Sequence, residues 1–542
     1  MFYRGTSLLT GLASAEALPA FRAPAALAER CREAADRAMR RDLPALKLSE
    51  RLADPAGWRR AQRARRQALE ALLPLEPDKA AVTRATDILC MIVEESAWSE
   101  NPALAPFDDE RHPEIDFQCA ETAALLGWTS RCFGDALPPR VRGKLAYEVR
   151  RRVFAPFLAH GDYPFMRGQG ARPLCILCDI LLSAILLETD TARRAAVLKQ
   201  CLRQLDDAVA ARENRVDALP DAAAETGAVA DLCALLRKLS RGQLDLTQVY
   251  PAPEWLDALL FPWLEGPWFA DPAAGTLKPA LSGAELFRIG LAAGDEALAA
   301  LGARLDRAGS LPSATVTARL MDLNQAQLLA AESGRVPKLK YAATAGNRLM
   351  VSRFNGLTCA LHTGGGRGNA GNLLLFADGT PVLAEVPGEA SVPLIAGQAQ
   401  QAEAGLALAA AGDFAVREDQ EQLTVDLTHA YPVSALVRAY QRTALAMRRE
   451  GVLRLVDALE LAQPAPVTFR FVTPEKPAAS GDALRLGPLE LSWETPLRVK
   501  VIELNARFPE GASDGKPLYR IELATPQPVT HGYFGFCFSG LS

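Results

Sequence analysis

The sequence predicts two domains in one chain, a helical domain followed by an antiparallel β-sandwich. Up to about residue 330, apolar residues recur at intervals of three and four, as on one face of an α-helix. After about residue 340 the interval becomes two, and tight turns separate short apolar runs. The 542 residues are too many for one ordinary core, which also favours two or more folded domains. Because helices and strands are segregated along the chain, a βαβ fold is excluded.

The helical domain is expected at residues 1–330. Segments containing Pro, Gly and Asp, such as 134–139, separate its helices, and short connections of this kind favour antiparallel neighbours. The clearest helices, each with one wide apolar face, are predicted at 120–133, 141–158, 173–187, 195–209 and 222–239.

The β-sandwich domain is expected at residues 341–542, after a linker at 331–340 in which Gly334 and Pro337 interrupt the apolar pattern. A hairpin is predicted around Asp378-Gly379, because this pair accepts the positive φ values of a tight turn. Strands are predicted at 373–376, 381–386, 423–427, 452–459, 467–472, 489–493, 497–504 and 519–524.

Composition and charge exclude several classes of protein. Lys and Arg number 60 against 64 Asp and Glu, so the chain lacks the positive surplus that binding to nucleic acid requires. No run approaches the roughly 18 consecutive apolar residues of a membrane span, so a membrane partner is not expected. The 10 cysteines lie mostly inside apolar runs and do not suggest a disulfide framework.

The N-terminus is a poor export signal. It contains a thin apolar patch and Ala13-Ser14-Ala15, which resembles a cleavage site, but Gly, Ser and Thr interrupt it. We therefore expect a cytoplasmic protein, with a periplasmic or secreted location as the less favoured alternative. The oligomeric state is left open by the sequence.

Five short motifs occur in a set order along the chain. They are Glu94-Glu95-Ser96-Ala97-Trp98, then His112-Pro113-Glu114-Ile115-Asp116 with Ala120-Glu121-Thr122-Ala123, then Tyr147-Glu148-Val149-Arg150-Arg151-Arg152, then Phe376-Ala377-Asp378-Gly379-Thr380-Pro381-Val382-Leu383, and finally Asp426-Leu427-Thr428-His429-Ala430-Tyr431-Pro432. In this order, over about residues 85–475, they resemble the heparinase II/III-like family. The resemblance implies an α/α toroid, an incomplete barrel of helices, followed by an antiparallel β-sandwich.

The resemblance also implies a polysaccharide lyase that cleaves a uronic-acid-containing glycan by β-elimination. This reaction needs a base for the C5 proton, a group that neutralises the adjacent carboxylate, and an acid for the leaving oxygen. The family supplies them from an Asn or similar donor, a Tyr and one or more His. The expected partner is therefore an acidic oligosaccharide or polysaccharide, and no cofactor or metal is expected.

The chain departs from the family at several of these positions. Arg172 follows Gly170-Ala171 where the family has an Asn-Asn-Trp motif, and the stretch 219–225 lacks the family's Tyr and Trp. The loop 364–371 lacks the family's histidines, which leaves only His362 nearby. Glu385 matches an Asp that binds structural zinc in some members, but without the imidazoles a zinc site is not expected.

Four residues are the catalytic candidates. Arg172 would neutralise the substrate carboxylate, which a guanidinium does well, although a helix-capping or surface Arg before Pro173 is an equal reading. His362 or His429 would remove the proton, since an imidazole with an ordinary pKa of about 6.5 suits this step near neutrality. Tyr431 would donate a proton. For His429 and Tyr431 the alternative is a structural corner at the end of a strand.

The substrate-binding candidates are Glu121, Arg367, Asn369 and Glu385. Glu121 lies among apolar neighbours, which indicates either a residue lining the toroid or a buried hydrogen-bond anchor. Arg367 and Asn369 belong to the glycine-rich loop.

Three other patterns have simpler explanations. Gly366, Gly368 and Gly371 match a dinucleotide-binding pattern, but a hairpin follows instead of the required helix. Cys175 and Cys178 lie on a predicted buried helical face. The basic run at 59–66 is expected on a solvated helix surface; if it faced a cleft, it would attract an acidic polysaccharide.

Two further functions stay open. The missing Asn, Tyr and loop His are compatible with a non-catalytic protein that binds acidic glycans or regulates through the same scaffold. A glycoside hydrolase using Asp116 and Glu121 is less favoured, because residues five apart do not share a helical face well.

Overall fold

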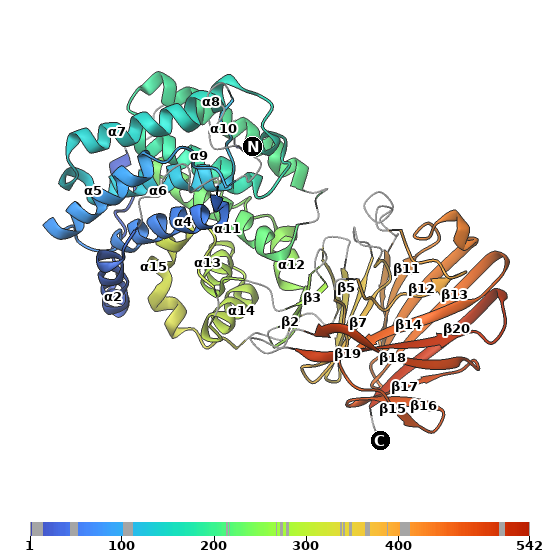
Figure 1. Cartoon of the computed structure of the whole chain (residues 1–542). Coiled ribbons are helices and arrows are strands. Elements are labelled where there is room, and N and C mark those ends of the chain that lie inside the picture. Colours follow the sequence, from blue (N-terminus) through green and yellow to red (C-terminus); the bar gives the residue numbers. More distant parts are fainter. Residues whose placement is uncertain are drawn as a thin grey trace. The chain divides into compact units, whose positions relative to one another are not determined.

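The computed structural model of the chain describes most residues, and these divide into a helical unit and a sheet unit (Figure 1). The described residues are 2, 15–43, 53–100, 112–212, 215, 217–266, 268–271, 275–277, 281–309, 311–335, 339, 342–345, 349–363, 369–386, 388–401, 412–508 and 515–540. The helical unit comprises Met1–Arg215, Asp221–Ala252 and Leu281–Pro337. The sheet unit comprises Val216–Pro220, Pro253–Ala280 and Lys338–Ser542.

The helical unit confirms the five helices expected from periodicity, with ends shifted by a few residues. The expected helix at 141–158 is built from α7, a π-helical turn at Arg150–Phe154 and α8. The helices are α2 (Ala28–Arg40), α4 (Pro55–Leu72), α5 (Lys79–Val93), α6 (Phe117–Phe133), α7 (Pro139–Val149), α8 (Ala155–Ala159), α9 (Pro173–Leu187), α10 (Thr191–Arg212), α11 (Leu219–Leu239), α13 (Gly283–Ala293), α14 (Glu296–Arg307) and α15 (Val316–Ala331).

Helix α6 lies at the centre of the helical unit and packs against α4, α9 and α15. Both α6 and α9 are buried along most of their length, because their residues are apolar or small on every side. Short polar side chains satisfy the first backbone N–H groups of several helices. These caps are Asp54, Asp78, Asp116, Ser282, Asp295 and Thr315.

The sheet unit includes the segment Pro253–Ala280, which the predicted boundary at residue 330 assigns to the helical domain. It contains α12 (Pro253–Leu260) and a small antiparallel sheet of β1 (Trp263–Glu265), β2 (Trp268–Asp271) and β3 (Gly275–Leu277). Arg353 joins this segment to the main sheets, since it donates hydrogen bonds to the backbone oxygens of Phe261 and Trp263 at 3.0 and 2.6 Å.

Three antiparallel sheets follow. One has the order β4 (Ala342–Ala345), β5 (Leu349–Phe354), β6 (Leu357–His362), β7 (Leu373–Ala377) and β8 (Thr380–Leu383). Another has the order β18 (Arg498–Phe508), β19 (Lys516–Ala524), β14 (Val467–Thr473) and β9 (Leu394–Ile395). The largest has the order β10 (Gly412–Val416), β11 (Gln420–Asp426), β12 (Val437–Met447), β13 (Val452–Ala465), β20 (Val529–Gly540), β17 (Leu489–Trp493), β16 (Ala483–Leu486) and β15 (Ala478–Ser480).

The sheets enclose one apolar core, which confirms the expected β-sandwich. Phe469 and Phe471 of β14 pack against Phe534, Phe536 and Phe538 of β20, with ring centroids 4.8 to 5.7 Å apart. Such offset and edge contacts are favourable for aromatic rings.

The predicted hairpin at Asp378-Gly379 is confirmed, because both residues adopt positive φ, 44° and 80°. Within the described part of the chain, no helix combines the length and apolarity needed to cross a bilayer.

Candidate functional site

The helical unit contains a cavity of about 460 Å³ between α2, α4, α6 and α15. A cavity of this volume accommodates a small ligand or a few sugar-sized groups. Its wall is largely apolar and includes Phe117. Charged side chains of both signs also line it: Arg63, Arg66, Glu70, Glu121 and Arg319.

Glu121 lies in this lining and is anchored by the protein itself. Its Oε1 accepts hydrogen bonds from the backbone N–H of Val316 at 2.7 Å and from Arg319 at 2.9 Å. Burial raises the pKa of Glu121, although Arg319 opposes the shift. Burial also raises the pKa of Asp179 on α9 well above its ordinary range, and the neighbouring Glu121 adds to this. Burial therefore opposes the ionisation of both carboxyl groups.

Arg172 lies immediately before α9, in the N-cap position, with a left-handed backbone (φ 54°). Its Nε donates to Asp221 Oδ1 at 2.6 Å, and its guanidinium stands 5.0 Å from the ring centroid of Phe117. Its side chain retains 26% exposure. Phe117 also lines the cavity, so its ring contacts both the Arg172 guanidinium and the cavity.

Glu225 supports the first turn of α9 from α11. Its Oε1 accepts the backbone N–H of Leu174 at 3.2 Å, and its Oε2 accepts from Arg215 at 2.6 Å and Arg212 at 3.4 Å. The side chain is fully buried. The stretch that lacks the family's Tyr thus contributes a buried ion pair that positions the helix after Arg172.

Two of the motifs behind the family resemblance are internal braces. Glu95 accepts hydrogen bonds from Arg65 and Arg66 at 2.9 Å each, and its backbone oxygen accepts from Arg152. The Arg152 guanidinium lies 4.8 Å from the Trp98 ring centroid.

The expectation of a fully solvated surface for the basic run is therefore wrong. Arg65 and Arg66 are buried, and both form ion pairs with the carboxylate of Glu95 in the interior. Arg63 is half-exposed, and both Arg63 and Arg66 line the cavity, so two members of the run face a concave surface.

In the sheet unit, three of the predicted residues lie together. Glu385 Oε1 accepts from the side-chain amide of Asn369 at 2.7 Å, and Oε2 accepts from Asn372 at 2.6 Å. His362 Nε2 is 3.6 Å from Glu385 Oε2, and neither ring nitrogen of His362 makes a hydrogen bond to a described residue. Burial lowers the pKa of His362 to about 4, so the ring is neutral at physiological pH.

This cluster does not fit the zinc site that the resemblance suggests for some family members. Both carboxylate oxygens of Glu385 already accept amide hydrogens, and His362 is the one imidazole of the group. A structural zinc site requires about four ligands, usually Cys or His. Arg367 and most of the glycine-rich loop, 364–368, lie outside the described residues.

His429 and Tyr431 follow β11 and differ sharply in accessibility. His429 lies on an exposed turn, which begins where the carboxylate of Asp426 accepts the backbone N–H of Thr428 at 2.9 Å. Tyr431 is buried, and its hydroxyl donates to the backbone oxygen of Pro393 at 2.8 Å. Burial raises the pKa of Tyr431. Tyr431 therefore has the buried environment of a structural corner, which is the alternative to its predicted role as a proton donor.

The sequence offered little indication that two further residues, Asp221 and Asp179, would lie beside the predicted site residues. Asp221, which engages Arg172, is 49 residues away in the chain. Asp179 interrupts the apolar run of α9, and that lone acidic residue was the available sign of a buried carboxyl. Cys175 and Cys178 are buried in the same helix, as expected.

The fold has counterparts among solved structures. A heparinase III is similar over 88% of this chain and 77% of its own, with 10% identity and a TM-score of 0.56. A chondroitin AC lyase of Streptomyces coelicolor A3, solved in complex with chondroitin sulphate, is similar over 99% and 82%, with 13% identity and a TM-score of 0.53. A Paenibacillus xanthan lyase is similar over 89% and 54%, with 11% identity and a TM-score of 0.52.

No protein-family model and no curated protein sequence match the chain. At such low identity the structural matches report on the fold alone. They confirm the expected arrangement of an α/α toroid followed by an antiparallel β-sandwich. The chain therefore has a polysaccharide lyase-like fold.

Proposed function

We propose that this chain is a polysaccharide lyase that cleaves a uronic-acid-containing oligosaccharide by β-elimination. One observation carries the proposal. Asp221 accepts a hydrogen bond from Nε of Arg172. The two Nη groups of Arg172 have no hydrogen-bond acceptor among the described residues. These two groups form the fork that binds a carboxylate in bidentate fashion. The likeness of the fold to lyases of acidic polysaccharides supports the same reading.

Neutralising the carboxylate is a demanding part of the reaction. The C5 proton becomes acidic only when the charge that develops on the adjacent carboxylate is stabilised. Arg172 supplies the positive charge that stabilises it, and Asp221 and Phe117 hold the guanidinium in place before substrate binds. Charged hydrogen bonds of this kind typically contribute about 1.5–3 kcal/mol each.

Of the two histidines predicted to remove the proton, His429 is the one accessible to an external substrate. Its imidazole is exposed, whereas that of His362 is fully buried and separated from any external substrate. The buried hydroxyl of Tyr431 already donates to a backbone oxygen, so we assign protonation of the leaving oxygen to water.

The test is to incubate the chain with uronate-containing oligosaccharides and analyse the products by mass spectrometry and NMR. Elimination yields one fragment that ends in an unsaturated uronate and is lighter by one water than the corresponding hydrolysis product. Arg172→Met should reduce the rate at least tenfold, and Arg203→Met, at an exposed position on α10, should leave it unchanged. Hydrolysis products without unsaturation would refute the proposal.

A second candidate is binding of the same glycans without cleavage. It is favoured by the burial of His362 and Tyr431, which removes two of the predicted acid–base groups from solvent. In this case the oligosaccharide binds without product formation, and Arg172→Met weakens binding while Arg203→Met does not. Turnover that is abolished by His429→Ala would exclude this second candidate.

A further inference from the structure

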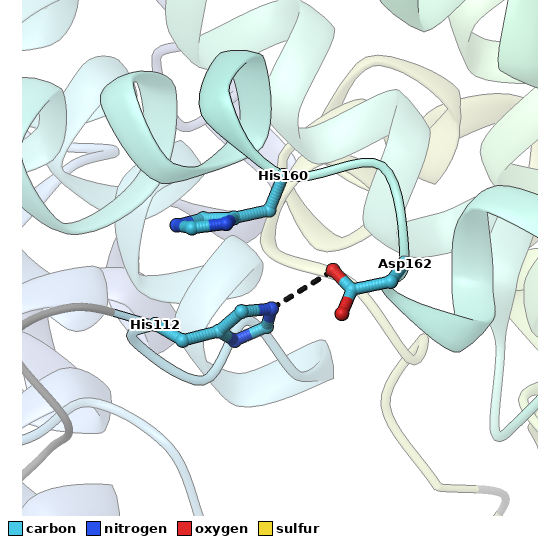
Figure 2. A group of neighbouring side chains, drawn as sticks. All are labelled: His112, His160 and Asp162. Carbon is cyan, nitrogen blue, oxygen red and sulfur yellow. Dashed lines mark hydrogen bonds and ion pairs between the residues drawn. The ribbon is translucent and has the colours of Figure 1, made fainter.

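A cluster of two imidazoles and a carboxylate lies in the helical unit, apart from the residues discussed above. His112, His160 and Asp162 each present a donor atom, and these three atoms lie within 4.8 Å of one another. Figure 2 shows the ring of His160 lying over that of His112, with Asp162 beside them. His112 Nε2 and Asp162 Oδ1 are 2.9 Å apart, and the two imidazole centroids are 4.3 Å apart.

The side chain of Tyr163 holds together the two segments that carry these residues. His112 lies in the turn that leads to α6, whereas His160 is the C-cap of α8 and Asp162 follows it. The hydroxyl of Tyr163 donates to the backbone oxygen of Pro113 at 2.7 Å. The ring of Tyr163 is also 4.8 Å from that of His112. The cluster is thus built on a local brace and does not depend on long exposed side chains.

The dimensions suit a metal ion of ordinary size. Zinc binds His nitrogen and carboxylate oxygen at about 2.0–2.2 Å, which places neighbouring ligand atoms of a tetrahedral site about 3.3–3.6 Å apart. The three donor atoms lie within 4.8 Å of one another, so side-chain rotations that move these atoms by about an ångström bring them to binding distance. The side chains of His112 and Asp162 are 37% and 66% exposed, which lets an ion enter from solvent.

We propose that His112, His160 and Asp162 form a binding site for one divalent transition-metal ion of the zinc class. Two imidazoles and one carboxylate are a donor set that borderline ions such as Zn²⁺ and Co²⁺ accept. The remaining coordination positions face solvent and take water. The bound ion links the turn before α6 to the end of α8. Because α6 begins at Phe117, on which Arg172 rests, the site fixes a segment close to the proposed carboxylate-binding group.

The test uses the full chain without an affinity tag, titrated with ZnCl₂ by calorimetry and with CoCl₂ by absorption spectroscopy. We expect one ion per chain. The variants His160→Ala and Asp162→Asn should each weaken binding at least tenfold, in line with the loss of one ligand out of three. The control His531→Ala removes an exposed histidine of β20 and should leave the affinity unchanged.

The cobalt spectrum separates this site from adventitious thiolate sites. Nitrogen and oxygen ligands give no sulfur-to-metal charge-transfer band, whereas the exposed Cys90 would produce one. Asp162 is an exposed side chain, so Asp162→Asn is expected to fold even where His160→Ala does not. Absence of stoichiometric binding, a thiolate spectrum, or binding unchanged in Asp162→Asn would each overturn the proposal.

Discussion

Arg288, in the interior of the helical unit, is surrounded by carboxyl groups. It donates to Asp231, and its Nε donates to Asp322 Oδ1 at 3.0 Å, while Glu285 Oε1 lies 3.9 Å from its Nη2. Burial raises the pKa of Asp231 and of Glu285 to about 7, although Arg288 opposes both shifts. One buried guanidinium does not offset three carboxylates, so protons bind near neutrality.

Replacing Glu285 with Gln should therefore change how stability depends on pH. The pKa of Glu285 is about 7 when folded and about 4.5 when unfolded, so between these values the folded chain binds more protons. The stability that the protonated Glu285 contributes is present below about pH 4.5 and is lost as the pH rises to 7. We expect the unfolding free energy of the wild type, relative to Glu285→Gln, to fall by about 2–3 kcal/mol over this range.

Denaturant unfolding followed by far-ultraviolet circular dichroism at several pH values measures this difference. Parallel pH profiles for the two proteins would show that Glu285 has no raised pKa.

His362 in the sheet unit should have the opposite pH dependence. Burial lowers its pKa to about 4, from about 6.5 in the unfolded chain. The folded chain then binds fewer protons, so its stability is full above pH 6.5 and is lost as the pH falls towards 4. We expect His362→Gln to unfold with a weaker acid sensitivity than the wild type, and the exposed His531→Gln to behave like the wild type. Equal acid sensitivity in His362→Gln would contradict the buried neutral state.

Among the elements, α13 and α14 approach each other through glycines. A Cβ added at Gly302 would lie 2.2 Å from the backbone N of Phe287, and one at Gly290 would lie 2.4 Å from that of Ala299. Backbone atoms cannot move aside as a flexible side chain does, so the two helices must separate to admit a methyl group.

We expect Gly302→Ala to lower the free energy of unfolding by about 1–3 kcal/mol through overpacking. Gly143→Ala in α7 is the matched control, because no atom lies within 4 Å of its added Cβ. That change should stabilise the chain by about 0.5–1 kcal/mol through helix propensity. Thermal melting of the two variants compares them directly, and a Gly302→Ala variant as stable as the wild type would contradict the close packing.

The elements were predictable where periodicity alone determines them. The helices around 120–133 and 173–187 and the hairpin at Asp378-Gly379 follow from local apolar spacing and turn chemistry. The short sheet of β1 to β3 was not predicted, because its strands of three or four residues are too short for a clear period. The burial of Arg65 and Arg66 was missed because their partner, Glu95, lies about 30 residues away.

At the scale of the whole molecule, the change of period near residue 340 was sufficient to predict a helical part followed by a β-sandwich. Side-chain clusters were predictable only where neighbouring strands assemble them. His362, Asn369 and Glu385 flank the consecutive strands β6 to β8, and they do meet. By contrast, His112 and Asp162 are 50 residues apart, and the contact between the turn before α6 and the turn after α8 leaves no local pattern in the sequence.

The proposed reaction depends on a guanidinium that neutralises a uronate while a proton is removed. The most direct measurement is ultraviolet absorbance of the unsaturated product during incubation with chondroitin sulphate, heparan sulphate and xanthan. We expect absorbance to rise with at least one of these glycans, at least tenfold more slowly in Arg172→Met and unchanged in Arg203→Met. No rise with any of them, from protein whose circular dichroism shows it to be folded, would contradict the proposed elimination.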